Sequence, residues 1–490
     1  MRFQVLIGWF MISQANLQQP LSGNKAMDEE YSRTLQMSQI SIVILAAGQG
    51  TRMRSSVPKV LQPLAGKALL SWVLETAQRI SPRLFVVVGH QKEQLQAAIQ
   101  TPVTWITQDK QLGTAHALKM ALPYIPDTGQ TLVLYGDIPL IEETSLRNLL
   151  HITSQTSLGV LTDIVNDPTG YGRIVRNDFG EILGIVEEKD ATEEQKGICE
   201  VNTGIYVIPN VHVHDWIARV DKRNMQQEYY LTDLVALARQ DGVKIITQKV
   251  KEHHWVAGVN DKQQLAALER VWQYHQAQKL LQQGVTLLDP SRFDLRGRLC
   301  CGQDVLIDIN AVFTGDNILE DGVTIGANCV LHNVTIHRGA YIAPFCHLQD
   351  CKIGEAARVG PFARLRPGTV LEKNTHTGNF VEIKKSTIAT GSKVNHLTYI
   401  GDSYVGKDSN IGAGCVTCNY DGVHKYATYI GEDCFIGSGV LMVAPVKINN
   451  GATVGAGSVI TKDCPKNTLS LSRSKQITIP GWKRPNKEGD

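Results

Sequence analysis

The chain has 490 residues, of which 43% are hydrophobic and 20% charged, and its formal net charge is +2. This length allows two or three domains, and the composition excludes a fibrous or a disordered chain. A charge so close to zero gives no reason to expect nucleic acid or a membrane surface as a partner. The ten scattered cysteines predict reduced thiols, and thus a cytoplasmic protein without stable membrane insertion.

Residues 1–37 are expected to lie outside the fold. Arg2 precedes an apolar run from Phe3 to Ile12, but this run is shorter than the roughly 20 residues of a membrane span. No small-residue cleavage site of a signal peptide follows it. Because Met37 immediately precedes the first strand pattern, we interpret the extension as disordered or as the product of an upstream start codon.

Residues 40 to about 260 alternate strand-like and helix-like patterns, which predicts βαβ units and a largely parallel, Rossmann-like α/β sheet. Ligands of such sheets bind at the carboxyl ends of the strands. The strands are expected at Ser41–Leu45, Leu84–Val88, Val103–Ile106 and Leu132–Tyr135, and helices at Leu70–Arg79 and Thr114–Leu122.

A glycine-rich turn, Gly48-Gln49-Gly50, follows the first predicted strand, and three cations come soon after it: Arg52, Arg54 and Lys59. Glycines allow a backbone to approach a phosphate chain, and successive N–H groups can cradle it. The cations could neutralise the charge that remains. An ordinary strand–helix turn is the alternative, but the cations favour a phosphate site.

A long helical pattern from 261 to 283 ends at Gly284, a residue typical of helix C-caps, and we interpret this segment as a connecting arm. Apolar residues then recur every six residues from Ile307 onward, with a one-residue slip before Ile336. This period is the signature of a parallel β-helix built from hexapeptide repeats, with each apolar residue pointing into a prism. The series runs through Ile307, Phe313, Leu319, Ile325, Leu331, Ile336, Ile342, Leu348, Ile353, Val359, Leu365, Leu371, Ile388, Val394, Ile400, Ile430, Ile436, Met442, Ile448, Val454 and Ile460.

One gap in the repeats cannot be filled by whole hexads. It lies between Ile411 and Ile430, and it predicts a loop that protrudes at about Thr417–Thr428. Insertions of this kind often form binding sites in repeat proteins. Within the gap, Cys415-x-x-Cys418 has no second cysteine pair at zinc spacing, so we expect no metal there.

These features occur together with a set of specific motifs: LAAGQGTRM…PKVL, QLGTAHA, YGDIPL, DPTGYGRI, EVNTGIY, GPFARLRPG, GNFVEIKK, NHLTYIGD and NIGAGCVTCNYDG. Over residues 38–484 the chain resembles the bacterial family of bifunctional N-acetylglucosamine-1-phosphate uridylyltransferases/glucosamine-1-phosphate N-acetyltransferases. The resemblance implies a uridylyltransferase domain at 38–260 and a helical linker at 261–284. It also implies a left-handed β-helix N-acetyltransferase domain with a C-terminal tail at 285–490.

The implied function is the synthesis of UDP-N-acetylglucosamine, which feeds peptidoglycan and lipopolysaccharide precursors. Acetyl-CoA first acetylates glucosamine-1-phosphate, and UTP then uridylylates N-acetylglucosamine-1-phosphate with release of pyrophosphate. The resemblance further implies Mg²⁺ as a cofactor and a homotrimer in which acetyl-CoA binds between prisms.

The first implied site transfers the nucleotide. In the family pattern Arg52 and Lys59 stabilise phosphates, and Asp137 and Asn260 hold Mg²⁺, which prefers oxygen ligands. From the residues alone, Asp137 could also be a turn or cap residue, Asn260 a helix N-cap, and Glu187 part of a solvated charged run. The residues implied to bind UTP and the sugar are Leu45, Ala46, Ala47, Gly48, Lys59, Gln108, Gly113, Thr114, Tyr135, Gly136, Asp137, Gly172, Glu187, Asn202 and Asn260.

The second implied site transfers acetyl to an amine that must first lose a proton, and an unperturbed histidine with a pKa around 6.5 suits this task. His396 occupies the base position of the family and Glu382 its orienting position, although a structural histidine is the alternative. Cys415 stands where the family pattern has threonine, which leaves thiol sensitivity open. The sugar-phosphate residues are Arg366, Lys384, Tyr399 and Asn410, and the acetyl-CoA residues are Ala413, Asn419, Tyr420, Ser438, Ala456 and Arg473.

Two other protein classes are compatible with parts of this pattern. One is another sugar-nucleotide pyrophosphorylase, such as an ADP-glucose enzyme, in which a β-helix serves assembly and regulation. The other is a non-catalytic assembly protein resembling the nucleotidyltransferase-like subunits of a translation exchange factor. His396 and the protruding loop count against the first, while Asp137, Lys59 and Asn260 count against the second.

Overall fold

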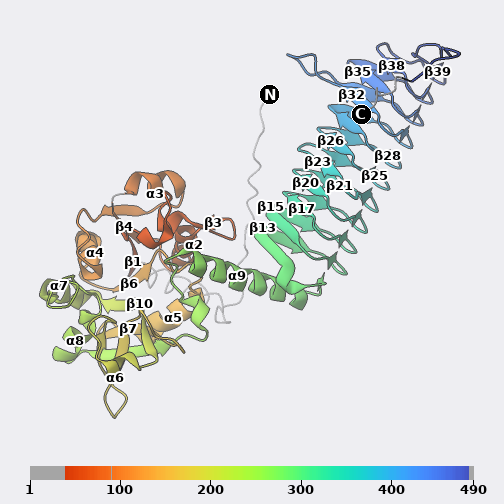
Figure 1. The fold of residues 1–490 in the computed structure, drawn as a ribbon. Coiled ribbons are helices and arrows are strands. Elements are labelled where there is room, and N and C mark those ends of the chain that lie inside the picture. Colours follow the sequence, from red (N-terminus) through yellow and green to blue (C-terminus); the bar gives the residue numbers. More distant parts are fainter. Residues whose placement is uncertain (1–38, 90, 485–490) are drawn as a thin grey trace, which may run out of the picture. The chain divides into compact units, whose positions relative to one another are not determined.

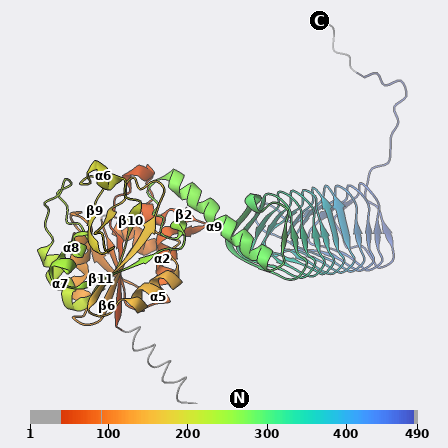
Figure 2. The same ribbon diagram turned by 90° about the horizontal axis from the view of Figure 1, so that it is seen from below.

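The computed structural model describes residues 39–89 and 91–484, so the predictions for residues 1–37 lie outside the described residues. The chain divides into two compact units (Figures 1 and 2). The first contains the residues up to Leu61 together with Leu69–Gly258, and the second contains Gln62–Ala68 and the residues from Val259 onward. Among the helices of the described residues, none has the length and apolar character needed to cross a membrane.

The first unit is built on a nine-stranded sheet, with strand order β11-β7-β10-β6-β1-β4-β5 and β8 and β9 to the side of this path. Neighbouring strands along the path are parallel, except that β10 runs antiparallel to both β6 and β7. The strands are β1 (Ile40–Ala46), β4 (Leu84–Val88), β5 (Thr104–Thr107), β6 (Gln130–Tyr135), β7 (Ser157–Ile164), β8 (Arg173–Arg176), β9 (Ile182–Val186), β10 (Glu200–Pro209) and β11 (Lys244–Lys249).

Helices connect these strands, and the α/β class predicted from the alternating pattern is confirmed. Central strands such as β1 are buried along nearly their whole length, as expected of a parallel sheet covered on both faces. The predicted elements occur within two residues of their expected ends. The reversal of β10 was not predicted, because an apolar run does not indicate the direction of its strand. The helices are α2 (Leu69–Gln78), α3 (Lys92–Ala98), α4 (Thr114–Ala121), α5 (Glu143–Ile152), α6 (Glu193–Lys196), α7 (Asn210–Arg219) and α8 (Asp233–Gln240).

The second unit is a parallel β-helix with three faces, which confirms the hexapeptide prediction (Figure 1). Residue Ile307 pairs with Ile325 in the next coil and Ile325 with Ile342 in the one after, so coils contain 18 or 17 residues. The 17-residue coils account for the slip in the six-residue series. All apolar residues of the predicted series are buried in one continuous core inside the prism.

We call the 11-stranded sheet the first face of the prism. Its strands are β12 (Thr286–Leu287), β14 (Leu306–Ile307), β16 (Thr324–Ile325), β19 (Tyr341–Ile342), β22 (Arg358–Val359), β25 (His376–Asn379), β28 (Lys393–His396), β31 (Asn410–Ile411), β34 (Phe435–Ile436), β37 (Thr453–Val454) and β39 (Leu469–Ser470).

The 17-stranded sheet supplies the other two faces, because its strands pair from coil to coil in two separate series. The long strands β13 (Phe293–Cys301) and β15 (Ala311–Leu319) begin both series. The second face continues through β17 (Val330–His332), β20 (His347–Gln349), β23 (Arg364–Leu365), β26 (Glu382–Lys384), β29 (Tyr399–Gly401), β32 (Val416–Cys418), β35 (Leu441–Val443) and β38 (Val459–Ile460). The third face continues through β18 (Thr335–Ile336), β21 (Lys352–Ile353), β24 (Val370–Leu371), β27 (Thr387–Ile388), β30 (Ser403–Val405), β33 (Thr428–Ile430) and β36 (Val446–Ile448).

The helix predicted at 261–283 is α9 (Lys262–Gln282), and Gly284 after it adopts φ +90°, as a C-cap glycine does. Helix α9 covers the first long strand of the β-helix. Its buried Gln273 donates to the carbonyl of Leu295 (2.9 Å) and accepts from the amide of Leu295 (2.7 Å). The side chain thus satisfies backbone groups of β13, the strand that would otherwise be an open sheet edge. A short hairpin, β2 (Pro63–Leu64) and β3 (Lys67–Ala68), belongs to the same unit.

Two of the buried threonines of the β-helix, Thr377 and Thr417, differ in hydrogen bonding. The Thr377 hydroxyl has no hydrogen-bond partner among the described residues, whereas the Thr417 hydroxyl accepts from the amide of Gly401 (2.8 Å). We expect Thr377→Val to raise the free energy of unfolding by about 1 kcal/mol, because it removes a buried polar group without a partner. Thr417→Val should lower it by about 1–3 kcal/mol. Thermal unfolding measures both, and changes of the same sign would contradict the roles given to the two hydroxyls.

Candidate active sites

The glycine-rich turn lies at the carboxyl edge of the parallel strands. Strands β1, β4 and β6 end together there, since Leu45 pairs with Val87 on one side and Tyr135 on the other. A cavity of about 130 Å³ opens at this edge, as expected for the ligand site of such a sheet. Its lining residues are Ala46, Ala47, Gly48, Gln49, Pro58, Lys59, Val60, Val88, Gly89, Gln91, Leu95 and Gln111.

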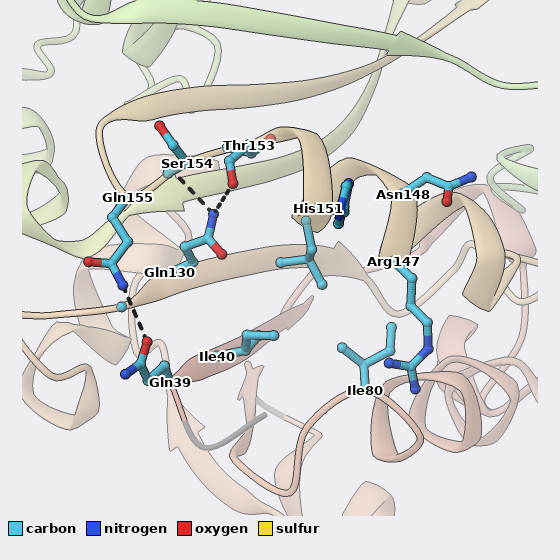
Figure 3. Close-up of a pocket in the computed structure, with 12 residues that line it drawn as sticks. Gln39, Ile40, Ile80, Gln130, Arg147, Asn148, His151, Thr153, Ser154 and Gln155 are labelled. Atoms are coloured by element: carbon cyan, nitrogen blue, oxygen red, sulfur yellow. Dashed lines mark hydrogen bonds between the residues drawn. The ribbon is translucent and has the colours of Figure 1, made fainter. Parts of the chain in front are cut away.

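A larger cavity of about 800 Å³ lies at the other end of β1 and β6, beside α5 (Figure 3). Its polar groups bond to one another: Gln130 donates to the carbonyl of Thr153 (2.9 Å), and Gln155 donates to the side chain of Gln39 (3.2 Å). None of the residues that sequence analysis proposed for a site lines this cavity. The smaller cavity, which the phosphate turn lines, is therefore the candidate nucleotide site.

Lys59 and Asp137 form an ion pair at the smaller cavity, and their side chains are only 13% and 16% exposed. Lys59 begins the short helix η2 (Lys59–Leu61), which packs closely against the turn. Gly50 permits this approach, because it adopts φ +61° and a Cβ atom on it would lie 2.6 Å from the Lys59 Cβ. The geometry thus places a cation and a carboxylate beside the backbone that would approach a phosphate chain. Arg52 lies exposed on η1 (Thr51–Met53).

The predicted uracil readers sit around the start of α4. Buried Gln108 donates to the carbonyl of Gly113 (3.2 Å), and its amide nitrogen lies 2.9 Å from Nδ1 of His116. Burial and then the charges of Lys119 and Lys222 lower the pKa of His116, so the ring is neutral and Nδ1 can accept from the Gln108 amide. His116 was not proposed from the sequence, because no pattern distinguishes it from a helix residue facing the core.

Gly113 has a conformation that other residues rarely adopt. Its φ is +114°, and a Cβ atom on it would lie 2.4 Å from the carbonyl oxygen of Tyr229. That carbonyl accepts from the amide of Ala115 (2.9 Å), and the Tyr229 amide donates to Leu112 (2.8 Å). The segment containing Tyr229 therefore fixes the loop that carries Gly113 and Thr114. Sequence reasoning missed Tyr229 because it is remote in the chain.

Gly172, Glu187 and Asn202, proposed as sugar-binding residues, lie together in the structure. The amide of Asn202 donates to the carbonyl of Gly172 (2.8 Å), and a Cβ atom on Gly172 would lie 3.4 Å from Oε1 of Glu187. The same oxygen accepts from the Thr232 hydroxyl (3.2 Å). Burial raises the pKa of Glu187, which excludes the solvated-surface alternative for this side chain.

Asn260 precedes helix α9 in the second unit. The helix cap is Asp261, whose side chain accepts from the amide of Gln264, so the N-cap role considered for Asn260 is wrong. The Asn260 amide itself donates to the Gln264 side chain (2.7 Å).

The β-helix aligns the proposed sugar-phosphate residues on its second face. Glu382 pairs in register with Tyr399 in the next coil, and its Oε1 accepts from Arg366 (2.8 Å). Lys384 forms an ion pair with Asp402 (3.0 Å) that is nearly buried on both sides. Lys384 is therefore not part of an exposed basic turn.

Asp402 was not proposed from the sequence, yet it organises this part of the face. It also accepts from the side-chain amide of Asn419 (2.5 Å). Burial alone would raise the pKa of Asp402, but the hydrogen bonds from Lys384 and Asn419 lower it overall. Asp402 therefore links a phosphate-binding candidate to the base of the protruding loop.

His396 lies at the corner between the first and second faces. Its Nδ1 is 2.7 Å from Oδ1 of Asn379, the residue in register with it in the preceding coil. Since an amide oxygen only accepts, Nδ1 carries the proton and Nε2 has a lone pair available for a substrate proton. The residue that contacts the ring is thus Asn379, which sequence analysis did not single out. Glu382, which was proposed to orient the ring, is bonded to Arg366.

Asn410 belongs to β31 on the first face, whereas Arg366, Lys384 and Tyr399 belong to the second. The acetyl-CoA candidates follow the first face around the same corner. The amide of Gly439 donates to the carbonyl of Ala413 (2.7 Å), and that of Gly457 donates to Ser438 (2.8 Å). In the next coil, Arg473 donates to the carbonyl of Ala456 (2.9 Å). Small residues in successive coils thus form one column.

The protruding loop is shorter than predicted. Thr417 and Thr428 are buried in strands β32 and β33, so the insertion comprises residues 419–427. Asn419 is buried at its base, and Tyr420 is exposed and pairs with Lys425 in an antiparallel bridge. Cys415 lies inside the prism, where burial raises the pKa of its thiol, so the thiol is shielded and unreactive.

Fold and sites together define a nucleotidyltransferase unit joined to a hexapeptide-repeat transferase. The MobA-like NTP transferase domain family matches residues 42–189, the GMPPB C-terminal domain family matches residues 348–443, and the bacterial transferase hexapeptide family matches residues 427–462. A solved UDP-glucose pyrophosphorylase complexed with UDP-glucose covers 48% of this chain and 98% of its own, at 17% identity and a TM-score of 0.41.

Curated relatives cover nearly the whole chain. "Bifunctional protein GlmU" of Chromobacterium violaceum is 53% identical over 92% of this chain and 100% of its own length. The proteins of the same name from Nitrosospira multiformis and Acinetobacter baylyi are each 52% identical, over 92% and 91% of this chain and 99% of their own lengths. The chain belongs to the family of bifunctional GlmU proteins. It is a bifunctional enzyme with a nucleotidyltransferase and an acyltransferase activity.

The close approach at Gly113 yields a stability prediction for the first unit. We expect Gly113→Ala to lower the free energy of unfolding by about 2–3 kcal/mol, because the new Cβ meets a backbone carbonyl at a positive φ. Gly184→Ala is the matched control, since nothing lies within 4 Å of a Cβ atom there and its φ is ordinary. Urea unfolding monitored for the first unit measures both. Equal small effects would show that the loop at Gly113 yields without cost.

Proposed function

We propose that this chain makes UDP-N-acetylglucosamine by acetylating glucosamine-1-phosphate with acetyl-CoA and then uridylylating N-acetylglucosamine-1-phosphate with UTP. The observation that carries the proposal is one chain with two constellations. One is the Lys59–Asp137 pair at the phosphate turn. The other is His396, held through Nδ1 by Asn379, at the corner that leads into the second face with its cations. The ten free thiols are typical of a reducing compartment, and we place the enzyme in the cytoplasm.

In the uridylyl step, a phosphate oxygen of the sugar phosphate attacks the α-phosphorus of UTP and pyrophosphate leaves. This reaction depends on positioning and charge neutralisation rather than on a covalent intermediate. Lys59 and Arg52 stabilise the triphosphate and the leaving pyrophosphate, while Gly172, Glu187 and Asn202 bind the sugar. Asp137 and Asn260 would hold Mg²⁺, which when bound shields phosphate charge, and both offer the oxygen ligands this ion prefers.

In the acetyl step, Nε2 of His396 takes a proton from the substrate ammonium group. The amine nitrogen then attacks the thioester carbonyl of acetyl-CoA and loses one of its two remaining protons, and the CoA thiolate leaves and takes up that proton. Asn379 holds the histidine in the required tautomer through Nδ1. Arg366 and Lys384 bind the phosphate of the sugar, for which a guanidinium fork is suited.

We also propose a homotrimer in which each acetyl-transfer pocket combines the second face of one copy with the first face of another. Asn410 supports this arrangement, because it lies on a different face from Arg366 and Lys384. A second support is a stack of phenylalanines at the corner beside His396. Phe345, Phe362 and Phe380 are 52%, 45% and 55% exposed, with ring centroids 5.0 and 5.2 Å apart. A continuous apolar row of this kind is typical of a surface that another protein covers.

The two activities provide reciprocal controls for each other. We expect Asp137→Ala to reduce uridylyl transfer about 10²-fold or more and to leave acetyl transfer nearly intact, because it removes a local charge partner and metal ligand. His396→Ala should reduce acetyl transfer about 10²-fold or more and spare uridylyl transfer. Separate assays of the two half-reactions measure both effects. Equal loss of both activities in either variant would refute the assigned role.

Mixing two inactive variants tests the shared pocket. Lys384→Ala alters the second face and Asn410→Ala the first, so each alone should lack acetyl transfer. In randomly mixed trimers about a quarter of the pockets, one half times one half, should combine two unaltered faces and recover activity. A mixture of Lys384→Ala and Arg366→Ala is the control, since both alter the second face. No recovery in the first mixture, or recovery in both, would contradict the arrangement.

A further inference from the structure

The first unit contains a fully buried arginine that the nucleotide chemistry does not use. Arg173 begins strand β8 and pairs with Val186 of β9 on one side and Val201 of β10 on the other. Its side chain is only 1% exposed. Burying a guanidinium is costly unless its donors are satisfied, so a side chain in this position calls for a physical reason.

The guanidinium of Arg173 joins three separate points of the chain. It donates to Oε2 of Glu188 (2.6 Å), to the carbonyl of Tyr171, and through Nε to the carbonyl of Lys196 (3.3 Å). The Glu188 oxygen also accepts from the amide of Gly170 (3.2 Å). One buried fork therefore ties the start of β8 to both ends of the segment that follows β9.

These anchor points flank the sugar-binding residues. Gly172 lies between Tyr171 and Arg173, and Glu187 immediately precedes Glu188. Because Arg173 fixes the neighbours of both, it sets the distance between the Gly172 backbone and the Glu187 carboxylate. Asn202, whose amide donates to Gly172, is held through the same contact.

Arg173 also acts on Glu187 through its charge. Burial raises the pKa of Glu187 and the charge of Asp190 raises it further, whereas the Thr232 hydrogen bond and the Arg173 charge lower it. An ionised carboxylate accepts hydrogen bonds from sugar hydroxyls through both of its oxygens, whereas protonation converts one of these oxygens into a donor. The other titratable groups that interact with Glu187 are Tyr135, Tyr206, Tyr230 and Asp233.

We propose that Arg173 is a positioning residue for the sugar phosphate in uridylyl transfer: it holds Gly172 and Glu187 in their binding geometry and places a positive charge beside Glu187. This inference rests on the proposed function and adds a residue that does not itself touch the substrate. Arg173 makes two contributions, the geometry of its guanidinium fork and its positive charge. Different substitutions remove them separately.

Arg173→Met removes both contributions, Arg173→Lys keeps the charge without the fork, and Glu188→Gln breaks one anchor while leaving the charge in place. The matched control is Arg176→Met. Arg176 is on the same strand and forms a two-pronged pair with Glu200 (both 2.7 Å), but it contacts none of the sugar-binding candidates. Each variant is assayed in the full-length enzyme for uridylyl transfer against pH, with acetyl transfer and the melting temperature as references.

We expect Arg173→Met to raise KM for N-acetylglucosamine-1-phosphate about tenfold or more, because several charge-assisted bonds are lost. KM for UTP should stay within about twofold. The acid limb of kcat/KM for the sugar phosphate should move to higher pH, since loss of the positive charge raises the pKa of Glu187. Arg173→Lys should restore the acid limb but not KM, and Glu188→Gln should raise KM without moving the acid limb to higher pH.

Three results would overturn the inference: an unchanged KM for the sugar phosphate in Arg173→Lys and Glu188→Gln, an equal rise in KM for UTP, or the same effects in Arg176→Met. The lysine and glutamine variants decide the matter if Arg173→Met does not fold. Glu187→Ala tests the proposed function separately. If that variant leaves uridylyl transfer unchanged, the sugar site itself is misassigned, whereas its loss together with unaffected Arg173 variants refutes only the positioning role.

Discussion

Backbone hydrogen bonding between parallel neighbours is the constraint on which both sites depend. In the β-helix each outward position lies beside the equivalent position of the next coil, so residues 17 or 18 apart become contacts. His396 meets Asn379, and Glu382 meets Tyr399, because of this register. In the α/β unit the parallel pairing of strands likewise brings together residues that are far apart in the sequence. It brings the ends of β1, β4 and β6 together, and thereby places Asp137, which follows β6, beside Lys59 of η2.

Three of the cations proposed to bind phosphate are each held by a carboxylate. Lys59 is paired with Asp137, Lys384 with Asp402, and Arg366 with Glu382. A flexible cation loses side-chain entropy when it binds a ligand, and a carboxylate that already holds it reduces this loss. The carboxylate also repels an incoming phosphate, so each pair needs a further positive charge nearby. In the second face that charge comes from Lys385, 3.9 Å from Asp402.

Much of the fold could be predicted from the sequence, because periodicity reports burial directly. The hexad residues from Ile307 to Ile460 all point into the prism, and the apolar run after Ile40 forms the central strand of the sheet. What the sequence could not indicate are partners remote in the chain. Asn379 and Asp402 become visible only once the coils are aligned, and Tyr229 only once its segment packs against Gly113.

The protruding loop was predicted too long because two inward-pointing threonines do not look like hexad residues in the sequence. A threonine in place of an aliphatic residue ends the hexad pattern, yet Thr417 still points inward, because its hydroxyl bonds the Gly401 backbone and so replaces apolar packing with a hydrogen bond. Polar residues at inward positions are acceptable wherever the adjacent coil supplies a partner. The same reasoning applies to Arg173, whose side chain is only 1% exposed although arginine is rarely buried. A buried polar side chain is therefore informative through its partners. Where these lie beside binding residues, as the Tyr171 carbonyl and the Glu188 carboxylate do, the cost of burial is offset by fixed geometry at the site.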